Sequence, residues 1–504
     1  MRPPPPTCWP GPMKSTGSAS WLATHREASL STESAHIAVD CGAESSRVMV
    51  VQLDRQRRSA VLHPITRFPT RSQQRGEGWF WCWQEHCQAV RAGVEAALQR
   101  FPQAQSVAVD TWGVDVVLCN QSYQPLADPR CYRDPRGARG QARLDGLCPR
   151  PQRFRQTGCA QLPINTLDQL SALALEEPEL LANCAHLVFL PDYLSGMLSG
   201  IWGCERSIAA TSSCTLPGAE AWHHELLATI GIDSQLFAPI SPSGRILGPL
   251  LGYPHCQVIA AAGHDTAAAI AALPGPAEST AYLSCGTWSL LGTVIDAPAL
   301  APEVAAAGFS NEAHWDGRIR LNRNIMGLWI LQQCRQDWLA AGGDGQQLDH
   351  AQLDYAQLAQ AAAQVADVAP PLDVDDPRFL APSSAEQRMS DRVSAWYQEQ
   401  GIAPPTSPAE TTRAILAGLA QAYAQALTQL QHLSGRRIEC LVLLGGGGRN
   451  ELLRQLTREA CGIRVEIGSS EATALGNALI QSHSLGQASP EDCWAYARKA
   501  RTSS

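Results

Sequence analysis

Three strand-like runs in this chain are each followed at once by a turn of small residues, and this recurrence limits the folds open to it. The runs end at Asp40, Ser284 and Leu444, and the turns lie at 42–46, 286–287 and 445–448. Short apolar runs bounded by glycine are typical of buried strands, and turns without bulky side chains let a ligand approach the backbone. The return of the same pattern indicates a second domain built like the first. Taken singly, each turn is better explained as an ordinary tight turn.

Hydrophobic periodicity predicts strands and helices in alternation around these turns. In the last third, Ser-Pro-Ala-Glu at 407–410 offers an N-cap, a proline at the first helical position and a capping-box glutamate. A long amphipathic helix should follow and end near Gly435. The β-α-β-α order over 440–482 indicates an α/β sheet covered by helices. Further predicted elements are a hairpin over 36–53, a strand at 59–68, a helix at 83–100 and a strand at 106–110.

Composition shifts suggest the domain boundaries. A proline run and many small polar residues precede position 36, which predicts a disordered tail over 1–35. The Leu-Pro-Gly-Pro sequence at 273–276 interrupts regular structure, and we place the boundary between an N-terminal domain, 36–275, and a C-terminal domain, 276–486, at this point. The remaining residues, 487–504, are interpreted as a second tail.

The overall composition excludes several classes of function. The net charge of −8 and the lack of a basic stretch argue against nucleic-acid binding. No apolar run approaches the roughly 18 residues that span a bilayer, so no membrane partner is expected. Seventeen cysteines without repeating spacing favour free thiols in a reducing cytoplasm over a disulfide framework. We expect a cytoplasmic monomer or homodimer.

The tripeptide His264-Asp265-Thr266 is the strongest candidate for chemistry. It lies between a strand-like run, 258–262, and an alanine-rich run, 267–273. A carboxylate in the first turn of the predicted helix would lie where free N–H groups and the helix dipole favour negative charge. Such a group suits orienting a substrate hydroxyl for phosphoryl transfer. An ordinary N-cap aspartate is the alternative interpretation of the same residues.

Other polar residues stand where a ligand could be bound. Asp40, at a strand end, is a natural ligand for Mg²⁺ beside a phosphate, or else a solvated strand end. Two acids, a tryptophan and a glycine share positions 110–115, which suits a polyol pocket or, alternatively, a hairpin turn around a buried tryptophan. Asn324 and Gln332 are spaced to share one face of a predicted helix, and they point either into a cleft or to solvent. Together with the glycine turns, these residues suggest a nucleotide held between two domains.

Seven runs resemble the FGGY carbohydrate kinases, and within them the branch that phosphorylates L-rhamnulose. They cover about residues 36 to 485 in order, and lie at 39–48, 110–115, 131–136, 191–194, 263–266, 282–289 and 324–329, with the glycine run at 445–448 completing the pattern. The resemblance implies an α/β fold of two ribonuclease-H-like domains, the actin-like ATPase fold, with a cleft between them. It implies sugar mainly on the first domain and ATP mainly on the second.

The resemblance also implies a reaction and its residues: ATP and L-rhamnulose give L-rhamnulose 1-phosphate and ADP, with Mg²⁺, in L-rhamnose catabolism. Asp265 would accept the proton of the O1 hydroxyl, and Asp40 would hold the metal. The ketose would contact Gly113, His264, Thr266 and Asn324; ATP would contact Ala43, Glu44, Ser45, Ser46, Arg47, Thr287, Gln332 and Gly446. The alternatives are a kinase for another ketose such as L-fuculose, a non-catalytic sugar sensor, and an actin-like ATPase that needs no sugar.

Two departures from the family pattern qualify these expectations. Ser46 replaces a usual glycine before the phosphate-loop arginine. If that position requires a positive φ, serine costs on the order of 1 kcal/mol and weakens the fit to ATP. The cysteine pairs that some relatives could bridge in the C-terminal domain have no clear counterparts here, and we predict no disulfide.

Overall fold

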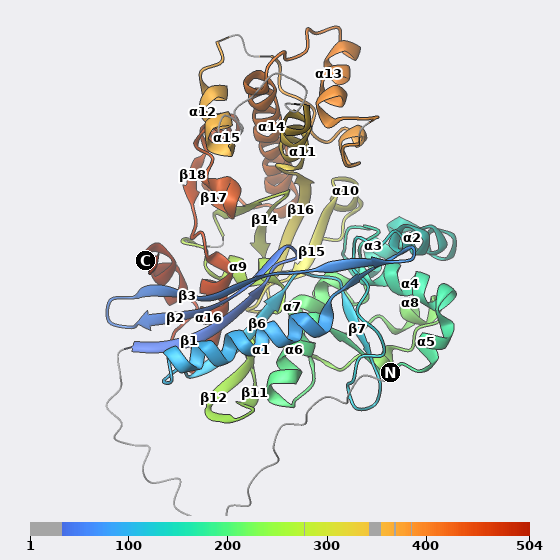
Figure 1. The fold of residues 1–504 in the computed structure, drawn as a ribbon, viewed down its shortest axis with the longest axis vertical. Helices are drawn as coiled ribbons and strands as arrows, with labels where there is room; N and C mark the ends of the chain where they lie inside the picture. Colours follow the sequence, from blue (N-terminus) through green and yellow to red (C-terminus); the bar gives the residue numbers. More distant parts are fainter. Residues whose placement is uncertain (1–32, 277, 342–353, 367–368, 385, 504) are drawn as a thin grey trace, which may run out of the picture.

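The computed structural model describes residues 33–276, 278–341, 354–366, 369–384 and 386–503, and it is built around two large sheets (Figure 1). The first sheet has the order β11-β12-β6-β1-β2-β3-β19 and the second the order β15-β16-β14-β13-β17-β18. The first comprises β11 (Arg245–Leu250), β12 (Tyr253–Ala260), β6 (Ser106–Thr111), β1 (Glu33–Cys41), β2 (Ser45–Asp54), β3 (Ser59–Pro69) and β19 (Ala500–Thr502). The second comprises β15 (Phe309–Ala313), β16 (Ile319–Met326), β14 (Trp288–Ile295), β13 (Thr280–Cys285), β17 (Cys440–Leu444) and β18 (Arg464–Ile467).

The two sheets share one topology. In the first, β1, β2 and β3 form an antiparallel meander, and β6 and then β12 add to β1 in parallel. In the second, β13, β14 and β16 form the meander, and β17 and then β18 add to β13 in parallel. The expectation of a second domain built like the first, in the α/β class, is therefore confirmed.

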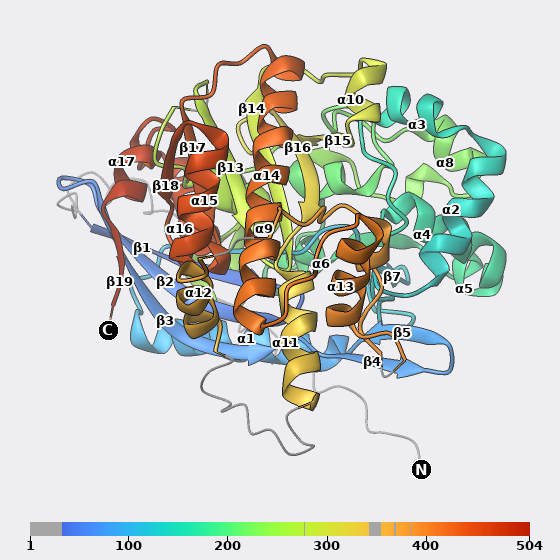
Figure 2. The ribbon, with the colours of Figure 1, turned by 90° about the horizontal axis from the view of Figure 1, so that it is seen from above.

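Helices cover both faces of each sheet. Helices α1 (Trp83–Arg100) and α6 (Leu190–Ser199) pack on one face of the first sheet, and α14 (Pro408–Ser434) packs on the outer face of the second. Figure 2 shows α14 lying along β14 and β16. Its predicted start and end are confirmed, because Ser407 and Glu410 form the capping box and Gly435 is its left-handed C-cap.

A pair of helices, α9 (Asp265–Ala271) and α16 (Ala472–Ser484), lies between the two sheets. Alanines of α9 pack on the first sheet, while Ala269 and Ile270 pack with Tyr282 and Val442 of the second. A Cβ built at Gly476 of α16 would lie 1.8 Å from the Ala268 carbonyl oxygen, so only glycine allows this approach. Small side chains thus let the helices pack closely enough to join both halves.

The structure corrects the predicted ends of the folded region. β1 begins at Glu33, so residues 33–35 belong to the sheet and not to the predicted tail over 1–35, whose residues 1–32 lie outside the described residues. The predicted tail over 487–504 is also wrong. It forms α17 (Asp492–Arg498) and β19, which pairs in parallel with β3. Buried Cys493 and Tyr496 provide the apolar anchor for this segment, whose polar sequence concealed it.

The remaining elements form smaller units around the sheets. Residues 116–240 contribute a separate core between β7, β8 and surrounding helices. The small sheets are β4 (Ser72–Arg75) with β5 (Gly78–Trp81), β7 (Val116–Cys119) with β8 (His186–Phe189), and β9 (Cys204–Glu205) with β10 (Ile240–Ser241). The other helices are α2 (Arg136–Leu147), α3 (Arg150–Thr157), α4 (Thr166–Glu176), α5 (Pro178–Ala182), α7 (Arg206–Ala209), α8 (His224–Thr229), α10 (Pro302–Ala306), α11 (Trp329–Ala341), α12 (Tyr355–Ala363), α13 (Met389–Glu399) and α15 (Glu451–Cys461).

Two predicted absences concern the described residues alone. None of the helices in these ranges combines the length and hydropathy needed to cross a bilayer. Every cysteine in the same ranges is a free thiol.

Candidate active site

The carboxyl ends of β1, β6 and β12 bring three acidic residues to one edge of the first sheet. Asp40 of β1 is in register with Asp110 of β6, and Thr111 forms a bridge with His264, which follows β12. Asp265 comes next in the chain. Because neighbouring parallel strands end at the same edge, Asp40, Asp110 and Asp265 gather there.

Asp265 is the first residue of α9, and its carboxylate is accessible. The backbone N–H of Thr266 donates to Asp265 Oδ1 at 2.5 Å, and the Thr266 hydroxyl donates to the same oxygen at 3.0 Å. The side chain is 31% exposed, so a ligand can still reach it. The predicted position of His264-Asp265-Thr266 at a strand-to-helix junction is confirmed.

A buried glutamate holds the loop that leads to Asp265. Glu205 Oε2 accepts hydrogen bonds from the Gly263 N–H at 2.9 Å and from the Ser207 hydroxyl at 2.6 Å. The Ser207 hydroxyl in turn accepts from the His264 N–H at 3.2 Å. The backbone beside the candidate catalytic residue is therefore fixed by side chains from another segment.

Arg47 links the first edge to the second domain. Its Nε and Nη2 atoms donate to Asp40 Oδ2 at 2.9 and 2.7 Å, and its Nη1 atom lies 2.5 Å from Glu471 Oε2. Burial raises the pKa of Asp40, against the opposing charge of Arg47. Burial, and next the charge of Asp40, raise the pKa of Asp110 well above its usual range. The electrostatic influence of Asp265 on both groups agrees with the three carboxyl groups sharing one edge.

The turn over 43–47 shows no backbone strain at Ser46. Ser46 lies in β2 and is absent from the positive-φ residues of the described chain. Its side chain is buried, and its hydroxyl is hydrogen-bonded to that of Thr70 at 2.8 Å. Serine therefore fits this position, and the conditional cost of a positive φ does not arise. Ala43 and Glu44 form the turn that precedes β2, and Ser45 is the first residue of β2.

Glycine turns meet at the corresponding edge of the second sheet. The turn at 286–287 follows β13, and the glycines at 445–448 follow β17, the strand paired with β13. A Cβ at Gly447 would lie 2.4 Å from Cys285 Sγ, and one at Gly327 would lie 2.5 Å from the Gly286 carbonyl oxygen. The turn after β17 therefore packs against the end of β13, and the turn at 286–287 packs against Gly327.

The predicted helix that would carry both Asn324 and Gln332 is wrong. Asn324 lies in β16, and α11 begins only at Trp329. Gly327 breaks the pattern, because it packs against the turn after β13, and the Leu328 N–H donates to the Gly286 carbonyl oxygen at 2.9 Å. Gln332 is in the first turn of α11 beside that turn. Asn324 is exposed, on the open stretch of β16.

The segment 110–115 contains a buried tryptophan but is not a hairpin. β6 pairs with β1 and β12, whereas β7 pairs with β8. Trp112 is 6% exposed, and its Nε1–H donates to Asp115 Oδ2 at 2.9 Å. Burial raises the pKa of Asp115 to about 6. The tryptophan and Asp115 thus hold the loop together, while Gly113 lies against Thr211, close to the bridge between Thr111 and His264.

The donor set around Asp40 fits Mg²⁺ brought by a nucleotide. Within the described ranges, no three His, Cys, Asp or Glu side chains form a metal-binding group. Asp110 Oδ1 is buried without a hydrogen-bond partner among the residues that the structure describes, and Asp40 is its neighbour across the strands. Mg²⁺ is usually held by one or two carboxylates together with water and substrate phosphates. These oxygens suit that arrangement.

Several residues that shape the site lay outside the sequence predictions. Glu471, Glu205, Glu312 and Arg320 contact Arg47 or the 263–265 loop from distant parts of the chain. No local motif marks them, since each acts through a contact made by the fold. The sequence alone shows each of them only as a charged residue.

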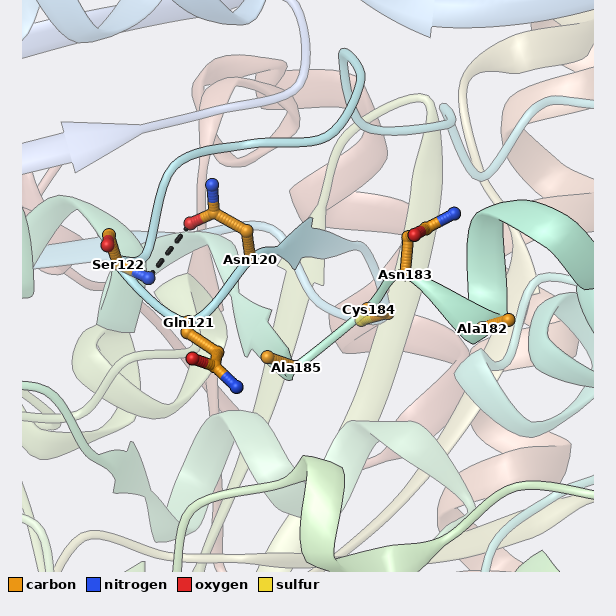
Figure 3. Close-up of a pocket in the computed structure, with 7 residues that line it drawn as sticks. All are labelled: Asn120, Gln121, Ser122, Ala182, Asn183, Cys184 and Ala185. Carbon is orange, nitrogen blue, oxygen red and sulfur yellow. Dashed lines mark hydrogen bonds between the residues drawn. The ribbon is translucent and has the colours of Figure 1, made fainter.

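A surface hollow lies apart from these strand ends. The hollow has a volume of about 550 Å³. Figure 3 shows its lining of amide and small side chains. The lining residues are Asn120, Gln121, Ser122, Ala182, Asn183, Cys184 and Ala185. They follow β7 or precede β8, outside both strand edges described above. The lining contains no carboxylate that could act as a base in phosphoryl transfer.

Comparison with known proteins agrees with this architecture. Residues 35–271 match the N-terminal domain, and residues 281–485 the C-terminal domain, of the FGGY family of carbohydrate kinases. Two similar proteins are rhamnulokinases, from Bacteroides thetaiotaomicron and an Enterobacter species. Each is 34% identical and aligns with 90% of this chain, covering 91% and 89% of the respective relatives.

Solved structures of sugar kinases share the fold. A ligand-bound xylulose kinase from Lactobacillus acidophilus superposes with a TM-score of 0.74 at 14% identity, covering 92% of both chains. A glycerol kinase from Plasmodium falciparum with ADP gives a TM-score of 0.72 at 11% identity, covering 93% of this chain and 94% of the other. The two-domain, actin-like ATPase architecture predicted from the sequence is thereby confirmed.

Proposed function

Because this chain belongs to the FGGY family of carbohydrate kinases, we propose that it transfers the γ-phosphoryl group of ATP to O1 of L-rhamnulose. The products are L-rhamnulose 1-phosphate and ADP. Similarity to two rhamnulokinases over 90% of the chain supports this substrate. We place the reaction in the cytoplasm, where ATP is available.

The observation that carries the proposal is the position of Asp265. Its carboxylate is accessible at the edge where β1, β6 and β12 end, and its Oδ1 atom is oriented by the backbone and hydroxyl of Thr266. The free Oδ2 atom can accept a proton from the O1 hydroxyl as the oxygen attacks phosphorus. Phosphoryl transfer requires positioning and charge neutralisation more than a strong base, which an aspartate satisfies.

Residues from both edges would hold the two substrates. His264, Thr266, Gly113 and Asn324 would contact the ketose. The turn over 43–47, with Thr287, Gln332 and Gly446, would bind ATP through backbone N–H groups that bulky side chains do not obstruct. Arg47 is paired with Asp40 and Glu471, so phosphates would compete with these carboxylates for its guanidinium.

We also propose Mg²⁺ as the cofactor, with Asp40 as the residue that holds it. When bound, Mg²⁺ would neutralise charge on the transferred phosphoryl group. The remaining work falls to the chain itself: Asp265 takes the hydroxyl proton, and the glycine turns orient the triphosphate.

The substrate is tested with purified protein, ATP and a panel of L-rhamnulose, L-fuculose, L-ribulose and L-xylulose. The proposal expects the highest kcat/KM for L-rhamnulose, with phosphate on O1 of the product by NMR. A higher kcat/KM for another ketose would reassign the substrate, and ADP release that no sugar stimulates would remove the kinase function.

A further inference from the structure

An ion pair on the second sheet reaches across to the candidate sugar site. Glu312 of β15 and Arg320 of β16 are direct cross-strand partners, and Arg320 Nη2 donates to Glu312 Oε2 at 2.8 Å. The Arg320 side chain is fully buried, and that of Glu312 is 14% exposed. Burial acts to raise the pKa of Glu312, but the Arg320 charge and the contact with His264 outweigh it and lower the pKa to about 2.

Both members of the pair contact the imidazole of His264, which belongs to the first domain. Arg320 Nη2 lies 3.0 Å from His264 Nδ1, and Glu312 Oε2 lies 3.3 Å from the same nitrogen. A guanidinium can only donate and an ionised carboxylate can only accept, so Nδ1 of His264 faces one donor and one acceptor that hold each other in place. Nε2 lies 3.5 Å from Asp265 Oδ1, on the side of the ring that faces the candidate base.

Burying the Glu312–Arg320 pair costs free energy, because both charged groups lose their contact with water. Arg320 Nη1 and the Tyr282 hydroxyl are both buried without a hydrogen-bond partner among the described residues. Buried ion pairs are weak sources of stability, and an unsatisfied buried donor adds a further penalty. The pair is therefore a costly way to stabilise the fold, although loss of one partner would leave the other charge buried and unpaired.

The strand that carries Arg320 continues into the open part of the site. Alternate residues of a strand share one face, so Arg320, Asn322 and Asn324 lie in a row on β16. The row passes from full burial at Arg320 to exposure at Asn324. Asn324 thus lies on the same face of β16 as Arg320, which contacts His264.

We propose that the Glu312–Arg320 pair positions the His264 imidazole for the sugar, so that sugar recognition on the first domain depends on docking of the second. Glu312 and Arg320 act through His264 and are positioning residues. The sugar readout rests on the proposed kinase function. If the sheets separate, His264 loses both partners and its Nε2 atom is no longer directed toward Asp265.

Glu312→Gln tests the proposal, with Arg323→Met as the matched control. Arg323 lies on the same strand and pairs with Asp375, but it is on the face of β16 opposite to Arg320, since successive strand residues alternate in direction. Glu312→Gln should raise the KM and the calorimetric Kd for L-rhamnulose by about 10-fold or more, as loss of an orienting partner typically does, with little change in the KM for ATP. Arg323→Met should leave the sugar parameters unchanged.

A double mutant separates positioning from a general structural role. In a His264→Ala background, Glu312→Gln should cause little further loss of sugar affinity, because its effect passes through His264. Arg320→Lys, which keeps the charge, should retain more affinity than Arg320→Met. Equal losses in the two backgrounds, or equal losses for Arg320→Lys and Arg320→Met, would overturn the proposal.

Nitrogen-15 NMR of the histidine rings gives a readout that needs no kinase activity. The His264 signals, assigned by comparison with His264→Ala, should shift in Glu312→Gln but not in Arg323→Met. Unchanged His264 signals in Glu312→Gln would refute the positioning role. A wild type inactive on every ketose would refute the proposed function alone.

Discussion

The two sheets share a five-stranded core with the same strand order, yet their carboxyl edges carry opposite kinds of chemistry. The first edge presents carboxyl groups, at Asp40, Asp110 and Asp265, whereas the second presents backbone, at 286–287 and 445–448. A shared topology therefore decides where a site forms, and the residues at the strand ends decide what it can do. Under the proposed function, proton transfer would take place at the first edge, and the phosphates would contact both the turn over 43–47 and the glycine turns of the second edge.

The two edges also depend on different physical supports. Carboxyl groups at the first edge accept hydrogen bonds from Arg47, Thr266 and Asn477. The Asn477 amide, for example, donates to Asp110 Oδ2 at 2.6 Å. The second edge depends on the absence of side chains, since a Cβ at Gly447 or Gly327 would overlap its neighbours. The first edge should thus be sensitive to loss of charge and the second to gain of bulk.

Removing the charge at residue 265 should produce the largest effect. Asp265→Asn keeps an acceptor for the Thr266 N–H but cannot take the hydroxyl proton. We expect kcat to fall by roughly 10²–10⁴-fold, the usual contribution of a general base, while the sugar Kd measured by calorimetry stays close to wild type. An unchanged kcat would show that the first edge does not supply the base.

Two buried carboxyl groups should respond to pH in opposite ways. Within the described part of the chain, the Asp168 carboxyl oxygens have no hydrogen-bond partner. Burial raises the pKa of Asp168 to about 7, so its ionisation costs stability as pH rises from about 4 through 7. Glu312, with its pKa lowered to about 2, stabilises the fold above about pH 4.5 and loses that contribution as pH falls toward 2.

The matching variants are Asp168→Asn and Glu312→Gln, compared with wild type by chemical unfolding from pH 8 to pH 3. At pH 8 Asp168→Asn should gain roughly 4 kcal/mol of unfolding free energy, and Glu312→Gln should lose roughly 3 kcal/mol, from about 1.4 kcal/mol per pKa unit. Both differences should shrink on acidification. A difference that does not vary with pH for either variant would contradict the assigned protonation.

Substitution by alanine should have different effects at two neighbouring glycines of the second edge. A Cβ at Gly447 would overlap Cys285, so Gly447→Ala should lower the unfolding free energy by about 1–3 kcal/mol. A Cβ at Gly446 would meet no atom within 4 Å, so Gly446→Ala should keep its stability and raise the KM for ATP. Gly146→Ala, an open site on α2, serves as the control. A normal KM for ATP in Gly446→Ala would exclude that residue from the nucleotide site.

The smallest effect concerns Ser46 at the first edge. Ser46→Gly would lose the hydrogen bond with Thr70 and loosen a strand, which should cost about 1 kcal/mol of unfolding free energy. Because Ser46 is unstrained, the KM for ATP should not improve. A lower KM for ATP in this variant would revive the view that serine hinders the loop.

The sequence predicted most of the elements that build the two edges. Strand-to-turn patterns located β1, β13 and β17, and the capping box located α14, because such signals are local. The helix through Asn324 was wrong since its periodicity ignored the contact of Gly327 with a turn about 40 residues earlier. Partners such as Glu312 were missed because only folding brings them to His264. The roles of the individual site residues stay predictions.

The central claim is that the acidic edge and the glycine edge act on one sugar and one ATP. The most direct measurement is ADP release by the purified protein, with Mg²⁺ and ATP, in the presence and absence of L-rhamnulose. The account predicts release that depends on the sugar in the wild type and is nearly abolished in Asp265→Asn. Release at the same rate without sugar, or in Asp265→Asn, would contradict it.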